Sequence, residues 1–165
     1  MHKLRKNKQS KYSLLRTVQP IKPDVVTLRP EKQFRVLEVR NLTESAYIVR
    51  FERHAMDFKA GQHITLGIPG DNQIREYSIY SAENEPWLEV LIREVEDGLV
   101  SRKLRRVNPG EPLQADGPFG FFTIDREKLT TRKFLFVATG TGIAPFHSLA
   151  GSYPGLDYQL IHGVR

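Results

Sequence analysis

The clearest candidates for ligand chemistry lie together in residues 75–81, whose sequence is Arg-Glu-Tyr-Ser-Ile-Tyr-Ser. Arg75 offers a planar fork of donors that suits the oxygens of a phosphate or pyrophosphate. Tyr77 offers an aromatic face and a hydroxyl, and the small donor Ser78 allows a ligand to approach closely. The stretch could hold a ligand with both a diphosphate and an aromatic ring, although an ordinary exposed strand would account for the same residues.

A second candidate site lies at the start of a helix predicted over residues 97–104. The pattern predicts Ser101 as the N-cap, and Gly98 permits a close backbone approach. Free N–H groups and the positive end of the helix dipole favour an anion there. Alternatively, the helix could serve only to close the end of a barrel. One helix could also close the barrel and bind an anion.

A third candidate is the glycine-rich turn at residues 139–145, which follows an unbroken apolar run at residues 134–138. Such a run is typical of a buried parallel strand, and residues 146–150 have helical spacing. A strand, glycine turn and helix could bring main-chain N–H groups to a diphosphate, and Pro145 suits the first helical turn. The spacing lacks the strict dinucleotide-binding fingerprint.

The first two candidate sites must be positioned by strands, and the sequence shows six short strand patterns. They lie at residues 34–40, 46–51, 63–69, 75–81, 88–93 and 113–116. With one helix among them, they predict a small closed antiparallel barrel. Residues 117–122, with two glycines and a proline between aromatic residues, could form a rigid loop under a flat ligand or a barrel corner. The apolar strand, the glycine turn and a further strand at residues 158–162 predict the start of a parallel α/β unit.

The expected fold class is therefore mainly β followed by α/β. Residues 33–125 are predicted to form a six-stranded antiparallel barrel, and residues 132–165 the start of a Rossmann-like parallel α/β domain. Two parallel strands cannot cover both faces of a sheet, and a doubly wound domain needs several more strands. We therefore expect the second domain to be incomplete and the chain to be a truncated form or a piece of a longer protein.

The composition excludes several classes of function. The 165 residues include no Cys, so this chain has no disulfide, thiolate zinc site or Cys-ligated iron–sulfur cluster. No run of about 18 apolar residues predicts a membrane span. The acidic residues at 94–97 are interpreted as a solvated loop and not as a metal site. The absence of Cys fits a reducing compartment, and we expect a cytoplasmic protein.

The net charge of +6 is concentrated at the start of the chain. Residues 1–35 hold ten of the 25 Lys and Arg residues but only two of the 19 acidic residues. A nucleic-acid-binding domain carries its positive charge on a folded face, and no such stripe is visible. Residues 1–32 are interpreted as a basic, flexible extension. They lack the apolar core of a secretory signal, whereas their composition would also suit a transit peptide.

Taken together, these residues resemble the ferredoxin–NADP⁺ reductase superfamily over residues 34–165. Three motifs carry the resemblance in the family's order: Arg-x-Tyr-Ser at residues 75–78, Gly-Leu-Val-Ser at residues 98–101 and Gly-Thr-Gly-Ile-Ala-Pro-Phe at residues 140–146. The Gly-Pro-Phe-Gly loop at residues 117–120 is also similar to the family's. With Leu-Ile-Arg at residues 91–93, before the Gly-Leu-Val-Ser motif, the sequence looks closest to bacterial flavodoxin reductases and to the reductase components of oxygenases.

The resemblance implies a barrel that binds FAD, followed by a domain that binds NADPH or NADH. It implies that Arg75 holds the flavin pyrophosphate, that Tyr77 packs on the isoalloxazine ring and that Ser78 hydrogen-bonds near N5, so Tyr77 and Ser78 are the expected catalytic residues. The remaining implied cofactor-binding residues follow from the other motifs. They are Ile92, Gly98, Val100 and Ser101 for the flavin, and Gly140, Thr141, Gly142 and Pro145 for the nicotinamide cofactor.

The implied function is an FAD-dependent oxidoreductase that passes hydride or electrons between NAD(P)H and an electron carrier. Ferredoxin, flavodoxin or an oxygenase component is the implied partner. The alternative is a non-catalytic flavin-binding subunit or fragment that depends on a partner, because the C-terminal segments usual in the family are missing from this sequence. No nucleic acid, metal ion or membrane is implied.

Overall fold

The computed structural model describes residues 33–164, and the predicted extension at residues 1–32 lies outside this range. Six antiparallel strands form one sheet in the order β4-β3-β6-β1-β2-β5. Their bounds are β1 Gln33–Asn41, β2 Ala46–Glu52, β3 His63–Gly67, β4 Ile74–Ser78, β5 Trp87–Arg93 and β6 Pro112–Phe119. An antiparallel bridge from Ile79 to Val90 joins the two ends of this order and confirms the predicted barrel.

Strand alternation fills the barrel. Tyr47, Val49 and Phe51 of β2 point inward, and each is fully buried. Phe34 and Val36 of β1 join them, and the rings of Phe34 and Phe51 meet edge to face at 6.0 Å. The apolar residues at every second position therefore make one core, which holds the strands that carry the candidate site.

Two strand ends differ from the prediction by three residues, and the other ends differ by at most two. The fourth strand ends at Ser78, because Tyr80 turns its N–H toward the carbonyl of Glu89. The sixth strand continues to Phe119, which pairs with His63 beyond a register shift. The first half of the predicted loop at residues 117–122 is therefore strand, and the turn begins at Gly120.

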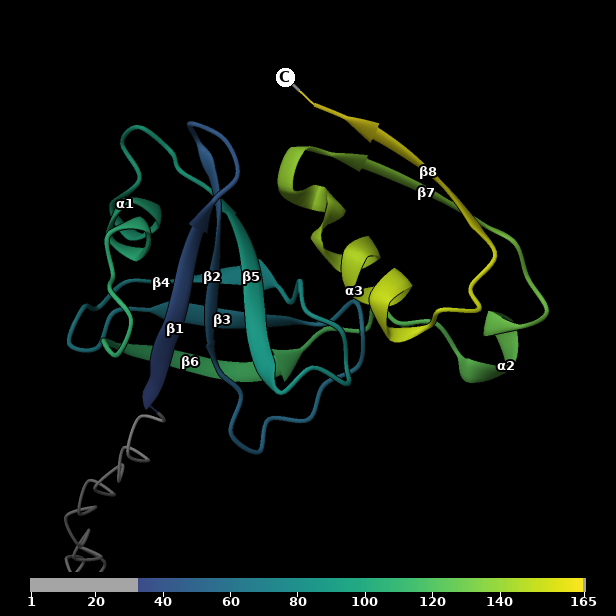
Figure 1. The fold of residues 1–165 in the computed structure, drawn as a ribbon, viewed down its shortest axis with the longest axis horizontal. Coiled ribbons are helices and arrows are strands. Elements are labelled where there is room, and N and C mark those ends of the chain that lie inside the picture. The colour runs from purple at the N-terminus through teal and green to yellow at the C-terminus, as the bar shows by residue number, and fades with distance from the viewer. Residues whose placement is uncertain (1–32, 165) are drawn as a thin grey trace, which may run out of the picture.

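Helix α1 (Leu99–Arg105) closes one end of the barrel (Figure 1) with the side chains of Val100, Ser101 and Leu104. The prediction that Ser101 caps this helix is wrong, since Gly98 occupies the N-cap position. Ser101 lies in the first turn, and its Oγ accepts a hydrogen bond from the N–H of Val95 at 3.2 Å. The Ser101 hydroxyl therefore ties the helix to the end of β5.

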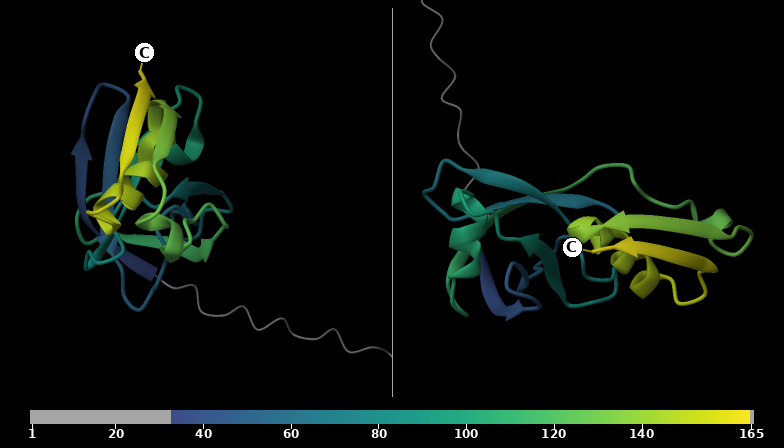
Figure 2. Two further views of the ribbon diagram at one scale, coloured as in Figure 1. Left: turned by 90° about the vertical axis from the view of Figure 1, so that its right-hand side faces the viewer. Right: turned by 90° about the horizontal axis from the view of Figure 1, so that it is seen from above.

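The second unit begins after a short helix, α2 (Arg126–Leu129). Strands β7 (Phe134–Thr139) and β8 (Tyr158–Gly163) pair in parallel, as predicted. Between them lie the 3-10 turn η1 (Gly140–Ile143) and helix α3 (Ala144–Ser152). Figures 1 and 2 show α3 between the barrel and this two-stranded sheet.

The prediction of a buried strand at residues 134–138 is only half correct. Phe136 and Ala138 are 5 % exposed against α3, and the ring of Phe136 stacks on that of Phe146 at 4.6 Å. Leu135 and Val137 are 61 % and 60 % exposed on the other face. One face of the sheet is therefore open, and periodicity along an all-apolar run could not show this. No helix in residues 33–164 is long and apolar enough to span a membrane.

Candidate functional site

Arg75 and Tyr77 lie on one face of β4, two residues apart. Their partners across the ladder are Leu66 and Ile64 of β3. Burial raises the pKa of Tyr77, and the nearby Arg75 guanidinium opposes this shift. The Arg75 side chain is exposed, and among the described residues its Nη1 donates to the carbonyl of Ile74. No carboxylate within residues 33–164 pairs with it, so its donors are available to an anion.

Tyr47 joins this strand to the start of α1. Its hydroxyl is buried and donates to the carbonyl oxygen of Ser101. Burial raises the pKa of Tyr47, and the neighbouring Tyr77 adds to the shift. Tyr77 also packs against the core that contains Tyr47 and Val100, so the motifs at residues 75–78 and 98–101 border one core although they are distant in the sequence. Sequence reasoning missed Tyr47, because nothing local marks a strand tyrosine as a contact to a distant helix.

Gly98 is required by packing at this junction. A Cβ on Gly98 would lie 2.6 Å from Oγ of Ser101 and 2.9 Å from Cβ of Val95. Val100 and Ser101 are 3 % and 7 % exposed, so their side chains are buried in the protein. Ile92 is 1 % exposed in the barrel core, and it pairs with Tyr47 of β2.

The main chain of β4 and β5 is open where the two strands face each other. Beyond the bridge at Val90, β5 pairs only with β2, and β4 pairs only with β3. Their facing edges, at residues 74–78 and 91–93, therefore keep unpaired main-chain groups next to the first turn of α1. Positive and hydrogen-bonding groups converge here from three elements.

Ser78 lies on the opposite face of β4 from Tyr77, because side chains alternate along a strand. It is half-buried and pairs with His63 of β3. The His63 ring is 5.9 Å from the ring of Phe119, and its Nε2 is 3.9 Å from the carboxylate of Glu76. A ligand at the end of β4 would thus find Tyr77 and Ser78 on two sides of one strand.

The glycine turn of the second unit has free space around it. Gly140 has φ +51°, and a Cβ on Gly140 or Gly142 would meet no atom within 4 Å. The ring of His162 hydrogen-bonds to the carbonyl of Gly140 through Nε2 at 2.9 Å. Pro145 stands in the first turn of α3, as predicted, and Thr141 is half-buried.

The turn is fixed against the outside of the barrel. Ile143 and Ala144 pack on Ile48 of β2 and Leu91 of β5. The predicted residues thus form two sets, one on the barrel around β4 and α1 and one on η1 and α3, and β5 separates them. The structure brings the members of each set together.

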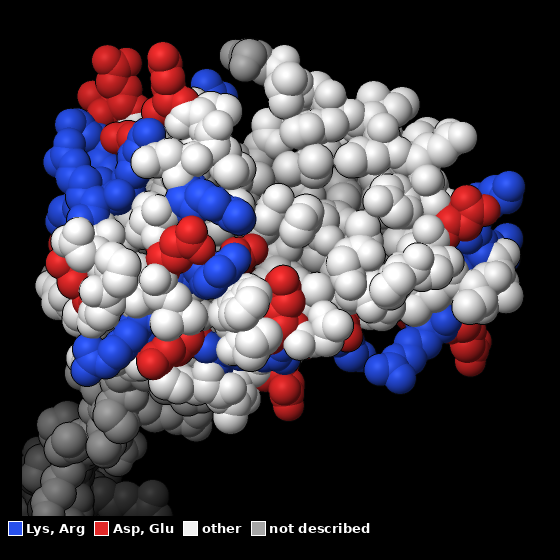
Figure 3. Space-filling view, in the orientation of Figure 1, with Lys and Arg blue, Asp and Glu red and all other residues white. Residues whose placement is uncertain are grey.

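Charged groups are unevenly distributed over the molecule (Figure 3). The end that carries α1 has many Lys, Arg, Asp and Glu side chains, whereas the surface over β7 and β8 is largely uncharged. Within residues 33–164, no group of three or more His, Asp or Glu residues is arranged to hold a metal ion.

A family model and individual relatives both match this chain. The sequence model of the oxidoreductase FAD-binding domain family matches residues 33–124. The chain is 40 % identical over 121 residues to ferredoxin–NADP reductase B of Sorangium cellulosum, a match that covers 70 % of this chain and 49 % of that protein. It is 32 % identical over 143 residues to the toluate 1,2-dioxygenase electron transfer component of Pseudomonas putida, covering 80 % of this chain and 41 % of that protein.

Among solved structures, the chain is similar to a ferredoxin NADP⁺ reductase from Neisseria gonorrhoeae that was crystallised with bound FAD and NADP. The TM-score is 0.70 at 27 % identity, over 79 % of this chain and 56 % of that one. The chain therefore spans about half the length of the relatives that it matches.

Proposed function

Because the chain belongs to the oxidoreductase FAD-binding domain family, within the ferredoxin–NADP⁺ reductase superfamily, we propose that it binds FAD at the junction of β4, β5 and α1 and receives hydride from NADPH or NADH. The observation that carries the proposal is the exposed Arg75 guanidinium, which lies on the same face of β4 as Tyr77 and has no carboxylate partner within residues 33–164. A diphosphate satisfies such a group, and a flat ring suits the adjacent tyrosine.

Each motif has a distinct task in this proposal. Arg75 binds the pyrophosphate with the main-chain N–H groups of Val100 and Ser101. Gly98 allows the close approach, since its own N–H donates to the carbonyl of Val95, and Ile92 supports the site from the barrel core. Tyr77 covers one face of the flat ring, and the hydroxyl of Ser78 donates a hydrogen bond at the ring's reacting edge. Bound flavin supplies the chemistry of accepting hydride and releasing electrons singly or in pairs.

The glycine turn receives the nicotinamide cofactor. The space beside Gly140 and Gly142 admits a diphosphate to main-chain N–H groups, and a side chain at either position would fill that space. Thr141 and Pro145 line the same approach. The fit is chemical as well as steric, because the turn leads directly into α3, whose positive dipole end favours an anion.

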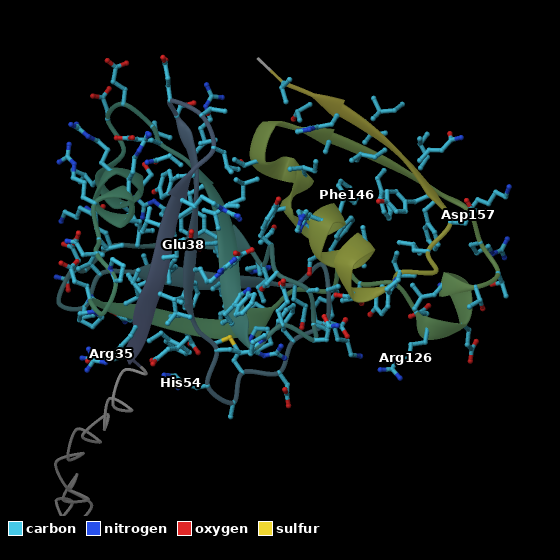
Figure 4. All side chains as sticks on the ribbon, viewed as in Figure 1. Arg35, Glu38, His54, Arg126, Phe146 and Asp157 are labelled. Carbon is cyan, nitrogen blue, oxygen red and sulfur yellow. The ribbon has the colours of Figure 1, made fainter. Side chains whose placement is uncertain are left out.

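The test of the flavin site is the variant Arg75→Ala. We expect its FAD affinity to fall about 10- to 100-fold, because a charge-assisted pair of hydrogen bonds contributes roughly 1.5–3 kcal/mol. FAD is titrated into the apoprotein and the quenching of flavin fluorescence is followed. Arg126→Ala removes an exposed arginine from α2 (Figure 4) and is the matched control. Equal FAD affinities in the two variants would refute the assignment of Arg75.

The relatives point to the acceptor. We propose an electron-carrier protein of the ferredoxin, flavodoxin or oxygenase-component class, in the cytoplasm. Reduction of such a carrier by NAD(P)H in the presence of this protein tests that step.

A second candidate function is a flavin-binding module without turnover of its own. The specific observation in its favour is that the residues proposed to hold the flavin lie on the barrel, apart from the glycine turn on η1 and α3. Anaerobic addition of NADPH to the FAD-loaded protein separates the two functions: bleaching of the flavin absorbance bands supports the reductase, and unchanged bands support the module.

A further inference from the structure

We propose that a set of contacts between α3 and the segment after β4, here called the α3 clasp, aligns the glycine turn with Ser78, and that Glu83 and Tyr153 are its positioning residues. The clasp comprises Tyr80, Ser81 and Glu83 on the barrel and His147, Ser148, Ser152 and Tyr153 on and after α3. The inference rests on the proposed function, because it concerns the geometry of hydride transfer between the two units.

The first part of the clasp lies in the middle of α3. The hydroxyl of Ser148 donates to the carbonyl of Ser81 at 2.7 Å, and both residues are fully buried. One residue earlier, Nδ1 of His147 lies 2.8 Å from the carbonyl of Tyr80, and the two rings stack at 3.7 Å. Consecutive residues of one unit therefore bind consecutive carbonyls of the other.

The second part lies at the end of α3 and centres on Glu83. One oxygen of its carboxylate, Oε1, accepts hydrogen bonds from the hydroxyl of Tyr153 at 2.6 Å and from the N–H of Ala60 at 2.7 Å. The N–H of Glu83 donates to Oγ of Ser152 at 2.8 Å. Burial and this carboxylate raise the pKa of Tyr153 to about 12, so the phenol keeps its proton and donates at physiological pH.

The barrel side of the clasp is itself rigid. The guanidinium of Arg53 donates to the carbonyls of Glu83 and Glu85 at 2.5 and 2.8 Å. On the helix side, Gly151 approaches so closely that a Cβ there would lie 3.1 Å from Cβ of Ala82. The two surfaces fit at both parts of the clasp and between them.

The position of the clasp along the chain links it to the reaction. Tyr80 comes two residues after Ser78, and the bridge from Ile79 to Val90 fixes the chain between them. Ala144, the first residue of α3, comes directly after η1 and three residues before His147. Because a displacement of about 1 Å can slow a reaction about 100-fold, loosening the clasp should slow hydride transfer. It should leave flavin affinity unchanged, since the proposed flavin contacts all lie on the barrel.

The test compares Glu83→Ala, Glu83→Gln and Tyr153→Phe in the protein loaded with FAD. Tyr158→Phe is the control, since Tyr158 is an exposed phenol whose ring packing Phe preserves. Three quantities are measured: the FAD dissociation constant, the limiting rate of flavin bleaching by NADPH in anaerobic stopped flow, and hydrogen exchange of the α3 amides. We expect Glu83→Ala and Tyr153→Phe to lower the limiting rate at least about tenfold, to keep the FAD affinity within about twofold and to speed exchange in α3. Glu83→Gln should restore most of the rate, because its amide oxygen accepts both bonds.

Two results would overturn the inference. An unchanged rate in Glu83→Ala would show that the clasp does not position the turn, and a loss of FAD affinity parallel to the loss of rate would show that Glu83 only supports the barrel. A wild-type protein that binds no FAD would refute the proposed function and, with it, the role of the clasp in hydride transfer. In that case, faster α3 exchange in Glu83→Ala would still support the clasp as the contact that holds the two units together.

Discussion

Two tyrosine hydroxyls donate hydrogen bonds at separate contacts between elements of the structure. Tyr47 donates to the carbonyl of Ser101 and holds α1 on the barrel, whereas Tyr153 donates to Glu83 and holds the end of α3. Burial is the main cause of the raised pKa of each phenol. A buried phenolate would be poorly solvated and would lose its donor, so each contact depends on the protonated form.

This dependence predicts a loss of stability at alkaline pH. Tyr153 has a pKa of about 12 in the folded protein against an ordinary value of 10.0. Between these two values the unfolded chain loses the proton that the folded protein keeps, so the free energy of unfolding falls as pH rises from about 10 to about 12. Tyr153→Phe should be less stable at neutral pH but should lose less stability across this window. Urea denaturation at pH 8 to 11.5 measures both slopes, and identical slopes would contradict the prediction.

At the scale of elements, loops far apart in sequence are held by close backbone contact. Gly61 has φ +97°, and a Cβ on it would lie 1.8 Å from the carbonyl oxygen of Phe122. The turn before β3 is thus pressed against the turn after β6, where the amide of Gln62 donates to the carbonyl of Gly120. These contacts fix the end of β3 that carries His63, the partner of Ser78.

Gly61→Ala should therefore destabilise the protein well beyond the cost of its backbone conformation. Gly70→Ala is the matched control, because Gly70 has φ +80° and a Cβ at this position would meet no atom within 4 Å. In the control, the free energy of unfolding should fall by about 1–2 kcal/mol, which is the cost of placing an L-residue in the left-handed conformation. Gly61→Ala should lose at least about 2 kcal/mol more, because the clash forces the two turns apart. Urea denaturation gives both values, and equal losses would contradict the packing.

At the scale of the whole molecule, α3 is packed on both sides. The clasp joins it to the barrel, and Phe146 (Figure 4) and Leu149 join it to the sheet through Phe136. Within residues 33–164, the far side of the sheet has no such cover, since Leu135, Val137 and Ile161 are exposed there. Helix α3 therefore contacts both the barrel and the sheet of the second unit.

Because one face of the sheet is exposed, substitutions at neighbouring residues of β7 should lower the stability of the protein by different amounts. Phe136→Ala should cost about 3–5 kcal/mol, because it leaves a cavity between the sheet and α3. Val137→Ala should cost less than about 1 kcal/mol, since Val137 is already 60 % exposed. Thermal unfolding of the two variants checks this contrast. A large loss in Val137→Ala would mean that its face is covered in solution.

The fold was predictable because its signals are local. Alternating apolar residues indicated the six strands, and an apolar run before glycines indicated β7 and its turn. The predictions were wrong where a contact with a distant residue determines the local structure. Ser101 has the right residue type for an N-cap, but Gly98 takes that position and Ser101 bonds back to Val95. Phe119 looked like part of a loop until His63 paired with it.

The sequence by itself determined the order of the motifs, the residue types at the candidate site and the family resemblance, because each depends on short stretches of chain. Only the tertiary structure decided which groups meet. It placed Tyr47 between Tyr77 and Ser101, put Ser78 and Tyr77 on opposite sides of β4, and joined Glu83 to Tyr153 across 70 residues. Contacts of this kind depend on packing and strand pairing between segments far apart in the chain, and no spacing rule within a single segment encodes them.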